Sequence, residues 1–294
     1  SPLYRLIGII FLAAIITGCM PSTVQETSVP LSTQTTTTLL QPQETLITFR
    51  IALQEPLPAG DSLFLTTVDE VTGLAFNPKD FIMTAEDSTH YSVMIPLELG
   101  AVVKYRYTRH GAMVVNEHIP NGQPVRYRLY HVEGPGVVQD TISRWTDTVF
   151  SGITGRIRGQ ITETRSGAPI PNLLVSVGGA HSFTKADGSF LIDGLPVGVH
   201  NLVAYAMDGM FQTYQQGALV AANSTTPASF SIAPSSMVSV IFSVSVPQTT
   251  PTEEPLRLAG NLYQLGNTYA DLAGGVSTLA SRMPVMSRLP DGRY

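Results

Sequence analysis

The sequence is poor in cysteine, tryptophan and charge. One cysteine and one tryptophan occur among 294 residues. A single cysteine excludes an internal disulfide framework and a cysteine-rich metal site. Charged residues make up only 13% of the chain, and the formal net charge is −5 at pH 7. The chain therefore lacks the basic surface that nucleic-acid binding requires, and we expect no nucleic-acid partner.

The chain also lacks an apolar run long enough to cross a bilayer as a helix. The segment Leu6–Ile16 is the most apolar and has 11 residues, whereas a transmembrane helix needs about 20. A run of this length, with Arg5 as its positive flank, is typical of the helical core of a secretory signal peptide. We expect residues 1–18 to be such a leader.

The only cysteine follows this leader directly. The sequence Ile16-Thr17-Gly18-Cys19 has an apolar residue, two small residues and then cysteine, and it resembles the lipobox of bacterial lipoproteins. The resemblance implies that Cys19 carries lipid and anchors the protein to the cell membrane or the outer membrane, facing the extracytoplasmic side. The alternative is a buried free cysteine after an apolar helix.

Residues 19–45 have the composition of a linker. They are rich in Thr, Ser, Pro and Gln, carry almost no charge and show no apolar periodicity. Such a stretch cannot bury enough apolar surface to offset the entropy of ordering. We therefore expect a flexible, disordered tether between the anchor and the first folded unit.

Short alternating segments and frequent turn residues predict an all-β fold for the rest of the chain. The sequence contains 25 glycines and 21 prolines, which separate the apolar segments from one another. In residues 46–149 the expected strands are 46–53, 62–66, 90–95, 102–108, 125–130 and 136–142. Several short strands over about 100 residues indicate a β-sandwich of one domain's length.

This first unit resembles a known carbohydrate-binding family. The segments 59–65 (AGDSLFL), 83–92 (MTAEDSTHYS), 104–109 (KYRYTR) and 140–145 (DTISRW) occur in order, and they resemble a divergent starch-binding domain, the family-20 carbohydrate-binding module. The resemblance implies an immunoglobulin-like sandwich that stacks sugar rings of starch, or of another polysaccharide, on exposed tryptophans. Trp145 lies where that family has its last-strand tryptophan.

Sugar binding needs flat rings and polar groups, so the candidates are aromatic and polar side chains. They are the rings of Trp145, Phe76, Tyr91, Tyr105 and Tyr107, with Lys104, Arg106, Asn116 and Glu117 as partners for hydroxyl groups. The alternative for each ring is a place in the core or a cross-strand contact. The alternative for the polar groups is a solvated face.

Residues 152–233 resemble the carboxypeptidase regulatory-like domain. The motifs G-x-I-x-G-x-I-T from Gly155, G-x-P-I-P-N from Gly167, T-x-x-D-G-S-F from Thr184 and G-L-P-x-G-x-H from Gly194 occur in order. The resemblance implies a β-sandwich without a peptidase centre. Asp187-Gly188 is a strong hairpin signal, because both positions tolerate positive φ. We expect His181 and His200 to be ordinary histidines, since no third metal ligand accompanies them.

Residues 236–294 are expected to begin another sandwich. Val238–Pro247 alternates strictly and predicts a strand, and Leu256–Asn261 (LRLAGN) resembles the second strand of the starch-binding family. About 60 residues cannot complete a sandwich, and half of one leaves a core face open. We therefore expect a truncated second starch-binding-like domain, and a sequence that is a fragment of a longer protein.

The motifs point to binding or support, not to catalysis. We find no nucleophile elbow, no phosphate-binding loop and no His/Cys cluster with metal spacing. For this piece we therefore expect no enzyme activity, no catalytic residue, no metal and no cofactor. The leading hypothesis is a lipoprotein with non-catalytic carbohydrate-binding modules. The alternatives are the accessory part of a glycoside hydrolase or other hydrolase whose catalytic domain lies beyond residue 294, and a structural stalk or adhesion module.

Overall fold

The structure is a computed structural model, and it describes residues 42–70, 75–258, 263–265 and 283–294. The predicted signal peptide 1–18, Cys19 and the predicted linker as far as residue 41 lie outside the described residues. The linker was expected to reach residue 45, whereas the first strand already begins at Glu44. The described residues form strands and one short 3₁₀ helix, Tyr263–Leu265. The prediction of an all-β, immunoglobulin-like fold is confirmed.

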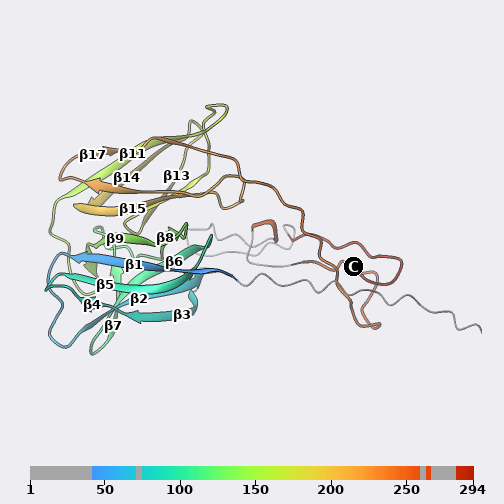
Figure 1. The fold of residues 1–294 in the computed structure, drawn as a ribbon, viewed down its shortest axis with the longest axis horizontal. Coiled ribbons are helices and arrows are strands. Elements are labelled where there is room, and N and C mark those ends of the chain that lie inside the picture. The colour runs from blue at the N-terminus through green and yellow to red at the C-terminus, as the bar shows by residue number, and fades with distance from the viewer. Residues whose placement is uncertain (1–41, 71–74, 259–262, 266–282) are drawn as a thin grey trace, which may run out of the picture. The chain divides into compact units, whose positions relative to one another are not determined.

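The first sandwich consists of two packed sheets (Figure 1). One sheet has the strand order β4-β5-β1-β9, and the other has the order β10-β7-β6-β2-β3 with β8 paired to β6. The strands are β1 (Glu44–Leu53), β2 (Ser62–Glu70), β3 (Ala75–Ile82), β4 (Thr84–Ala85), β5 (His90–Glu98), β6 (Val102–His110), β7 (Val114–His118), β8 (Arg128–His131), β9 (Gly136–Ile142) and β10 (Arg144–Trp145).

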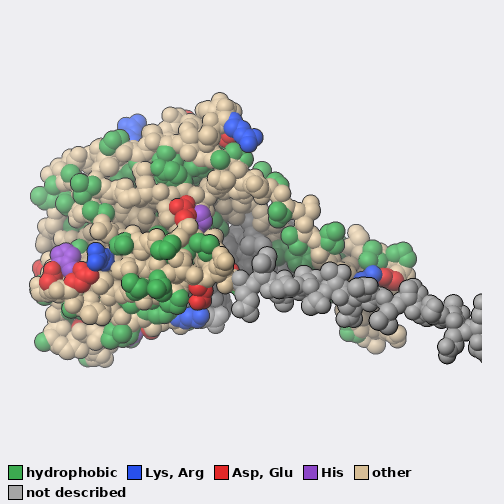
Figure 2. All heavy atoms as spheres, in the orientation of Figure 1, with side chains coloured by type: hydrophobic (Ala, Val, Ile, Leu, Met, Phe, Trp, Pro, Cys, Tyr) green, Lys and Arg blue, Asp and Glu red, His purple; other side chains and the backbone are tan. Residues whose placement is uncertain are grey.

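Alternation along β1 explains how this sandwich forms its core. Ile47, Phe49 and Ile51 point inward and are at most 2% exposed. Burying side chains of this size stabilises the fold by about 1.5–3 kcal/mol each. On the opposite face, Leu46 is 54% exposed and Met94 of β5 is 60% exposed. Figure 2 shows hydrophobic side chains gathered over this outer face of the first sandwich.

The second sandwich also has two sheets, ordered β14-β11-β17 with β18 paired to β11, and β13-β12-β15-β16. Its strands are β11 (Thr154–Glu163), β12 (Leu174–Val177), β13 (Ala180–Phe183), β14 (Ser189–Pro196), β15 (Gly198–Tyr205), β16 (Tyr214–Val220), β17 (Thr225–Pro227) and β18 (Phe230–Ile232). The turn at Asp187-Gly188 leads into β14 as expected. Gly188 has φ +74°, and Asp187 Oδ1 accepts a 2.9 Å hydrogen bond from the Ser189 amide.

The strand expected at Val238–Pro247 does not form. These residues have no strand assignment, and Val238, Val240 and Ile241 are 80%, 66% and 91% exposed. Alternation produces a strand only where another strand supplies hydrogen bonds and a face to cover. Here the described residues provide one pair of hydrogen bonds between Val244 and Tyr294. Of the proposed third sandwich, residues 259–262 and 266–282 lie outside the described part of the chain.

Candidate functional site

A buried ionic cluster connects the two sheets of the first sandwich. Arg128 of β8 donates from Nη2 to Glu117 Oε2 of β7 at 2.8 Å, and from Nη1 to Asp140 Oδ1 of β9 at 3.0 Å. Tyr105 and Tyr107 of β6 donate their hydroxyl groups to Asp140 Oδ2 at 2.8 and 2.9 Å. All these side chains are buried. Each carboxylate therefore has charged and neutral donors in place of water.

The two tyrosines and the arginine of this cluster keep their protonation states. Burial raises the pKa of Tyr105 and Tyr107 well above its ordinary value of 10.0, and the charge of Asp140 raises it further. Burial lowers the pKa of Arg128, but Glu117 and Asp140 outweigh this effect and raise the pKa above its usual value. The phenols therefore remain neutral and the guanidinium remains charged. The cluster holds strands together and offers no open face to a ligand.

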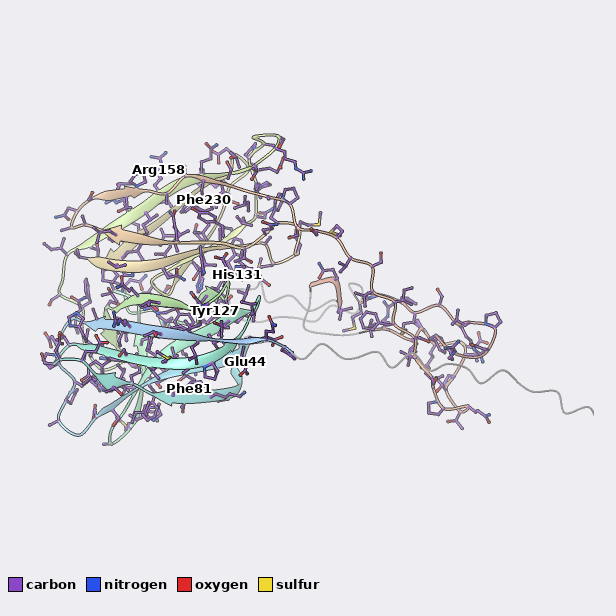
Figure 3. All side chains as sticks on the ribbon, viewed as in Figure 1. Glu44, Phe81, Tyr127, His131, Arg158 and Phe230 are labelled. Atoms are coloured by element: carbon purple, nitrogen blue, oxygen red, sulfur yellow. The ribbon has the colours of Figure 1, made fainter. Side chains whose placement is uncertain are left out.

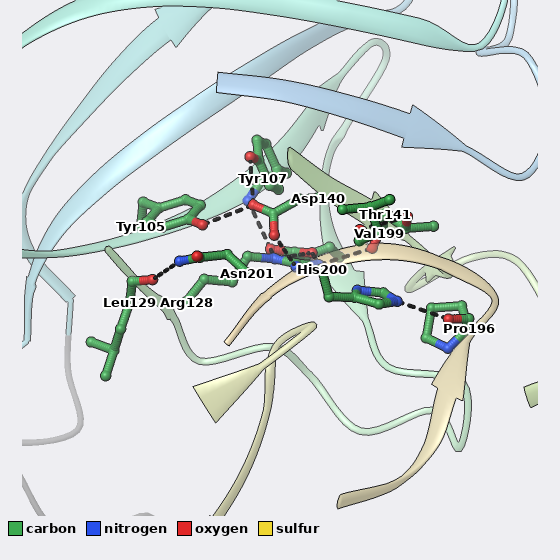
Figure 4. A network of polar contacts seen from close by, with 11 residues as sticks. Tyr105, Tyr107, Arg128, Leu129, Asp140, Thr141, Pro196, Val199, His200 and Asn201 are labelled. Atoms are coloured by element: carbon green, nitrogen blue, oxygen red, sulfur yellow. Dashed lines mark hydrogen bonds and ion pairs between the residues drawn. The ribbon is translucent and has the colours of Figure 1, made fainter. Parts of the chain in front are cut away.

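The same strands also hold the second sandwich (Figure 4). Thr141 Oγ1, next to Asp140, donates to the Val199 carbonyl at 3.3 Å, and Asn201 Nδ2 donates to the Leu129 carbonyl at 3.2 Å. Arg128 Nη2 donates to the Thr141 carbonyl at 3.2 Å. The ionic cluster and these hydrogen bonds between sandwiches are therefore parts of one network.

A side-chain amide completes the polar contact between the sandwiches. Gln215 of β16 accepts from the His131 amide at 3.0 Å and donates to the His131 carbonyl at 2.7 Å. The amide group thus pairs with the end of β8 as a neighbouring strand would. Figure 3 shows His131 and Tyr127 on the side of the first sandwich that meets the second.

An apolar cluster lies beside these hydrogen bonds, and we call the whole contact the joint. Its apolar members are Val68, Tyr127 and Leu129 from the first sandwich, and Leu174 and Val203 from the second. Each is at most 6% exposed. Such burial is typical of a core, whereas contacts between domains are usually more polar. Strand β12 of the sheet β13-β12-β15-β16 is consequently buried on both faces.

Two glycines allow the backbones to approach at the joint. A Cβ atom on Gly179 would lie 2.5 Å from Val125 Cγ2, and one on Gly198 would lie 2.6 Å from Thr141 Oγ1. Both residues have positive φ, +82° and +140°, which L side chains rarely adopt. Any side chain at either position would strain the backbone and press on the first sandwich.

The predicted sugar-binding rings do not form an exposed platform. Tyr105 and Tyr107 are 0% exposed and belong to the core, so they cannot stack on a sugar. Tyr91 is half-buried and packs against the same core. Phe76 lies in β3, and its side chain is outside the described part of the structure. The alternative placement in the core is therefore correct for both tyrosines of β6.

The polar candidates are also engaged in internal contacts. Glu117 is 0% exposed and pairs with Arg128. Lys104 places its Nζ 4.7 Å from the centre of the Tyr127 ring. The carbonyl of Asn116 accepts from the Thr146 amide at 3.0 Å. Lys104 is partly exposed, so it is neither in the core nor fully solvated.

Trp145 lies at the edge of a cleft and is not an open platform. The residue is 7% exposed, and the guanidinium carbon of Arg109 lies 5.7 Å from its ring centre. Arg109 also pairs with Asp61 at 2.8 Å. The adjacent cleft has a volume of about 270 Å³, and Ser143 and Phe150 contribute to its lining. Trp145 is the only predicted ring that lines this cleft.

The described residues contain neither a metal site nor a membrane span. Nowhere in that part of the chain do three His, Cys, Asp or Glu side chains come close enough to hold an ion. None of the helices described there has the length and hydropathy to cross a bilayer. His181 and His200, which the sequence left without a third ligand, both lie near the joint.

Comparison with known proteins supports one of the two family resemblances. Residues 156–233 match the family model of the carboxypeptidase regulatory-like domain. The resemblance of the second sandwich to that family is therefore confirmed. No curated protein matches the sequence at a significant level.

Solved structures show only distant likeness. A family 15 glucoamylase from Hypocrea jecorina is 20% identical with a TM-score of 0.27, over 34% of this chain and 17% of its own length. The minor pilin GBS52 from Streptococcus agalactiae is 11% identical with a TM-score of 0.26, over 67% of this chain and 99% of its own. A streptococcal ancillary pilin is 12% identical with a TM-score of 0.24, over 65% of this chain and 69% of its own length. The chain thus spans less than a fifth of the glucoamylase, and no function is inferred from these scores.

Replacing Arg128 by Met should strongly destabilise the first sandwich. The change leaves Glu117 and Asp140 buried without their cation, which typically costs about 3–5 kcal/mol. The matched control is Arg50→Met, because Arg50 is 53% exposed and pairs with Glu86 at 3.3 Å. We expect the control to cost less than about 1 kcal/mol. Urea unfolding measures both, and equal losses would contradict a special role of the buried cluster.

Proposed function

We propose that this chain is a lipid-anchored extracytoplasmic stalk in which two β-sandwiches move as one body. The joint is the observation that supports this proposal. Neighbouring domains are expected to move relative to each other unless their interface is large and apolar. Here Tyr127 and Leu129 pack against Leu174 and Val203. The hydrogen bonds of Thr141, Asn201 and Gln215 between the sandwiches lie beside this apolar cluster. A stiff spacer needs such a contact, whereas independent binding modules do not.

The anchor and the tether complete the stalk. The lipobox-like sequence before Cys19 and the Thr-rich segment that follows it support attachment of the sandwiches to a membrane surface. The joint then keeps the second sandwich at a constant distance from the first.

Replacing Val203 by Asp should separate the sandwiches without unfolding either one. Val203 is 0% exposed at the joint, but it would face solvent if the second sandwich stood alone. An unpaired buried carboxylate is costly, so separation relieves it. The measurement is the distribution of distances between spin labels on Ser88→Cys and Ala222→Cys, which are exposed positions in the two sandwiches, in the full chain carrying Cys19→Ser. We expect a narrow distribution for the parent and a broad one for Val203→Asp.

The control for this experiment is Leu219→Asp. Leu219 lies in β16 of the same sheet and is 65% exposed, so its carboxylate stays in water and the distribution should remain narrow. A broad distribution in the parent would contradict the stalk. A narrow one in Val203→Asp would show that the joint does not depend on its apolar cluster.

Replacing Cys19 by Ser should abolish membrane attachment. The thiol is the only group in the chain that the lipobox resemblance assigns to acylation. We expect radiolabelled palmitate to enter the parent protein in bacterial cells and not the variant, and the variant to leave the membrane fraction. Met20→Ser serves as the control and should keep the label. Label retained by Cys19→Ser would refute the anchor.

Glycan binding is the second candidate, and the cleft beside Trp145 supports it. The cleft combines the edge of an indole with polar groups of Ser143, Arg144 and Thr148. If the cleft binds an α-glucan, Ser143→Trp should fill it and reduce retention on insoluble starch at least tenfold. Ser166→Trp, on an exposed turn of the second sandwich, is the control. No retention of the folded parent would eliminate starch as the ligand and leave the stalk unaffected.

A further inference from the structure

His181 occupies an unusual position in the joint. It lies on β13 of the second sandwich, and its ring centre is 5.0 Å from that of Tyr127 in the first sandwich, with an angle of 54° between the rings. Tyr127 is 1% exposed. The Nε2 atom of His181 is buried and has no hydrogen-bond partner. A proton added to this nitrogen would find no acceptor while the joint is closed.

The charged groups that act on His181 are cations of the first sandwich. Lys104 comes from β6, Arg126 from the segment before β8, and Arg128 from β8. Lys104 and Arg126 lie 4.7 and 5.9 Å from the centre of the Tyr127 ring that His181 contacts. A hydrogen bond with the Tyr127 backbone acts in the opposite direction. A positive charge on His181 would thus meet three like charges across the joint.

The effect of pH on the joint follows from these surroundings. Burial, and after it the three cations, lower the pKa of His181 from 6.5 to about 4. In separated sandwiches the ring is in water and its pKa returns toward 6.5. The separated state therefore binds the proton more tightly. Closure is fully favoured above pH 6.5 and is weakened as the pH falls toward 4, by at most roughly 300-fold.

We propose that His181 is an acid-sensitive latch, whose protonation releases the second sandwich from the first. The joint is then closed at neutral pH and opens in an acidic medium. This inference rests on the proposed function, because it concerns the joint that makes the stalk stiff. It adds a condition under which the stalk becomes flexible.

His200 provides the comparison within the same chain. It is 0% exposed, and its Nε2 bonds to the Pro196 carbonyl of its own sandwich at 2.8 Å. Burial lowers its pKa as well, but Asp140 opposes the effect of Arg128. Its ring lies inside the second sandwich and, unlike His181, does not stack on a ring of the first. Its Nδ1 is also buried without a partner, so protonation of His200 destabilises its own sandwich, while Arg128 and Asp140 of the first sandwich act on it in opposite directions.

The test is the spin-label distance between Ser88→Cys and Ala222→Cys, measured from pH 7.5 to pH 4.5 in the full chain with Cys19→Ser. We expect a narrow distribution at pH 7.5 that broadens below pH 6. His181→Phe keeps a ring against Tyr127 but cannot take up a proton, so it should stay narrow at pH 4.5. His200→Gln should broaden like the parent. Circular dichroism at each pH verifies that the sandwiches remain folded.

An NMR titration of the His181 ring gives a second measurement that does not require opening to be complete. We expect a pKa between 4 and 6.5 in the parent, lower than the value near 6.5 in Val203→Asp, where the sandwiches are apart. A narrow parent distribution down to pH 4.5, or equal broadening in His181→Phe, would overturn the latch alone. A broad distribution at pH 7.5 would overturn the stalk instead, so the two failures are distinguishable.

Discussion

The ion pairs of Arg128 with Glu117 and Asp140 are the interaction on which the structure depends most. Taking these charges out of water is expensive, and it is tolerated only because every carboxylate has close donors. In return, strands β7 and β8 of one sheet are joined to β9 of the other. Since Arg128 also bonds to the Thr141 carbonyl, and Thr141 bonds to Val199, the position of the second sandwich follows from the same cluster.

Local patterns predicted most of the strands but not the cluster. The range 136–142 was predicted from alternation and matches β9 residue for residue. The same alternation places Asp140 between Val138 and Ile142 on the inward face, and an ionisable side chain there requires a partner. The acidic residue at an inward position of this strand is thus a sequence signal for a buried polar contact. Its partners could not be identified, because Arg128 and Glu117 come from other strands whose register no local pattern specifies.

The tyrosines of β6 were proposed as sugar-binding rings for a related reason. Tyr105 and Tyr107 alternate with cations, a pattern that fits both a sugar platform and a core face. The structure places the rings in the core, and Lys104 against Tyr127 near the joint. Whether a face is solvated depends on what packs against it, and here a domain packs nearby whose first strand begins at Thr154, 50 residues after Lys104. Val238–Pro247 illustrates the converse, since its alternation, interrupted at Ile241, meets no neighbouring strand among the described residues.

Strand β12 is buried on both faces, which reflects its position at the joint. Its four residues, Leu174–Val177, are all buried, although a strand with one solvated face should alternate. Val175 and Val177 belong to the core of the second sandwich, whereas Leu174 packs into the joint. A strand buried on both faces within a two-sheet domain requires a third layer. That layer is the first sandwich, so the second sandwich as folded here depends on contact with its neighbour. A domain built in this way loses part of its support whenever the contact opens, which is why a titratable ring at this contact has consequences for both sandwiches.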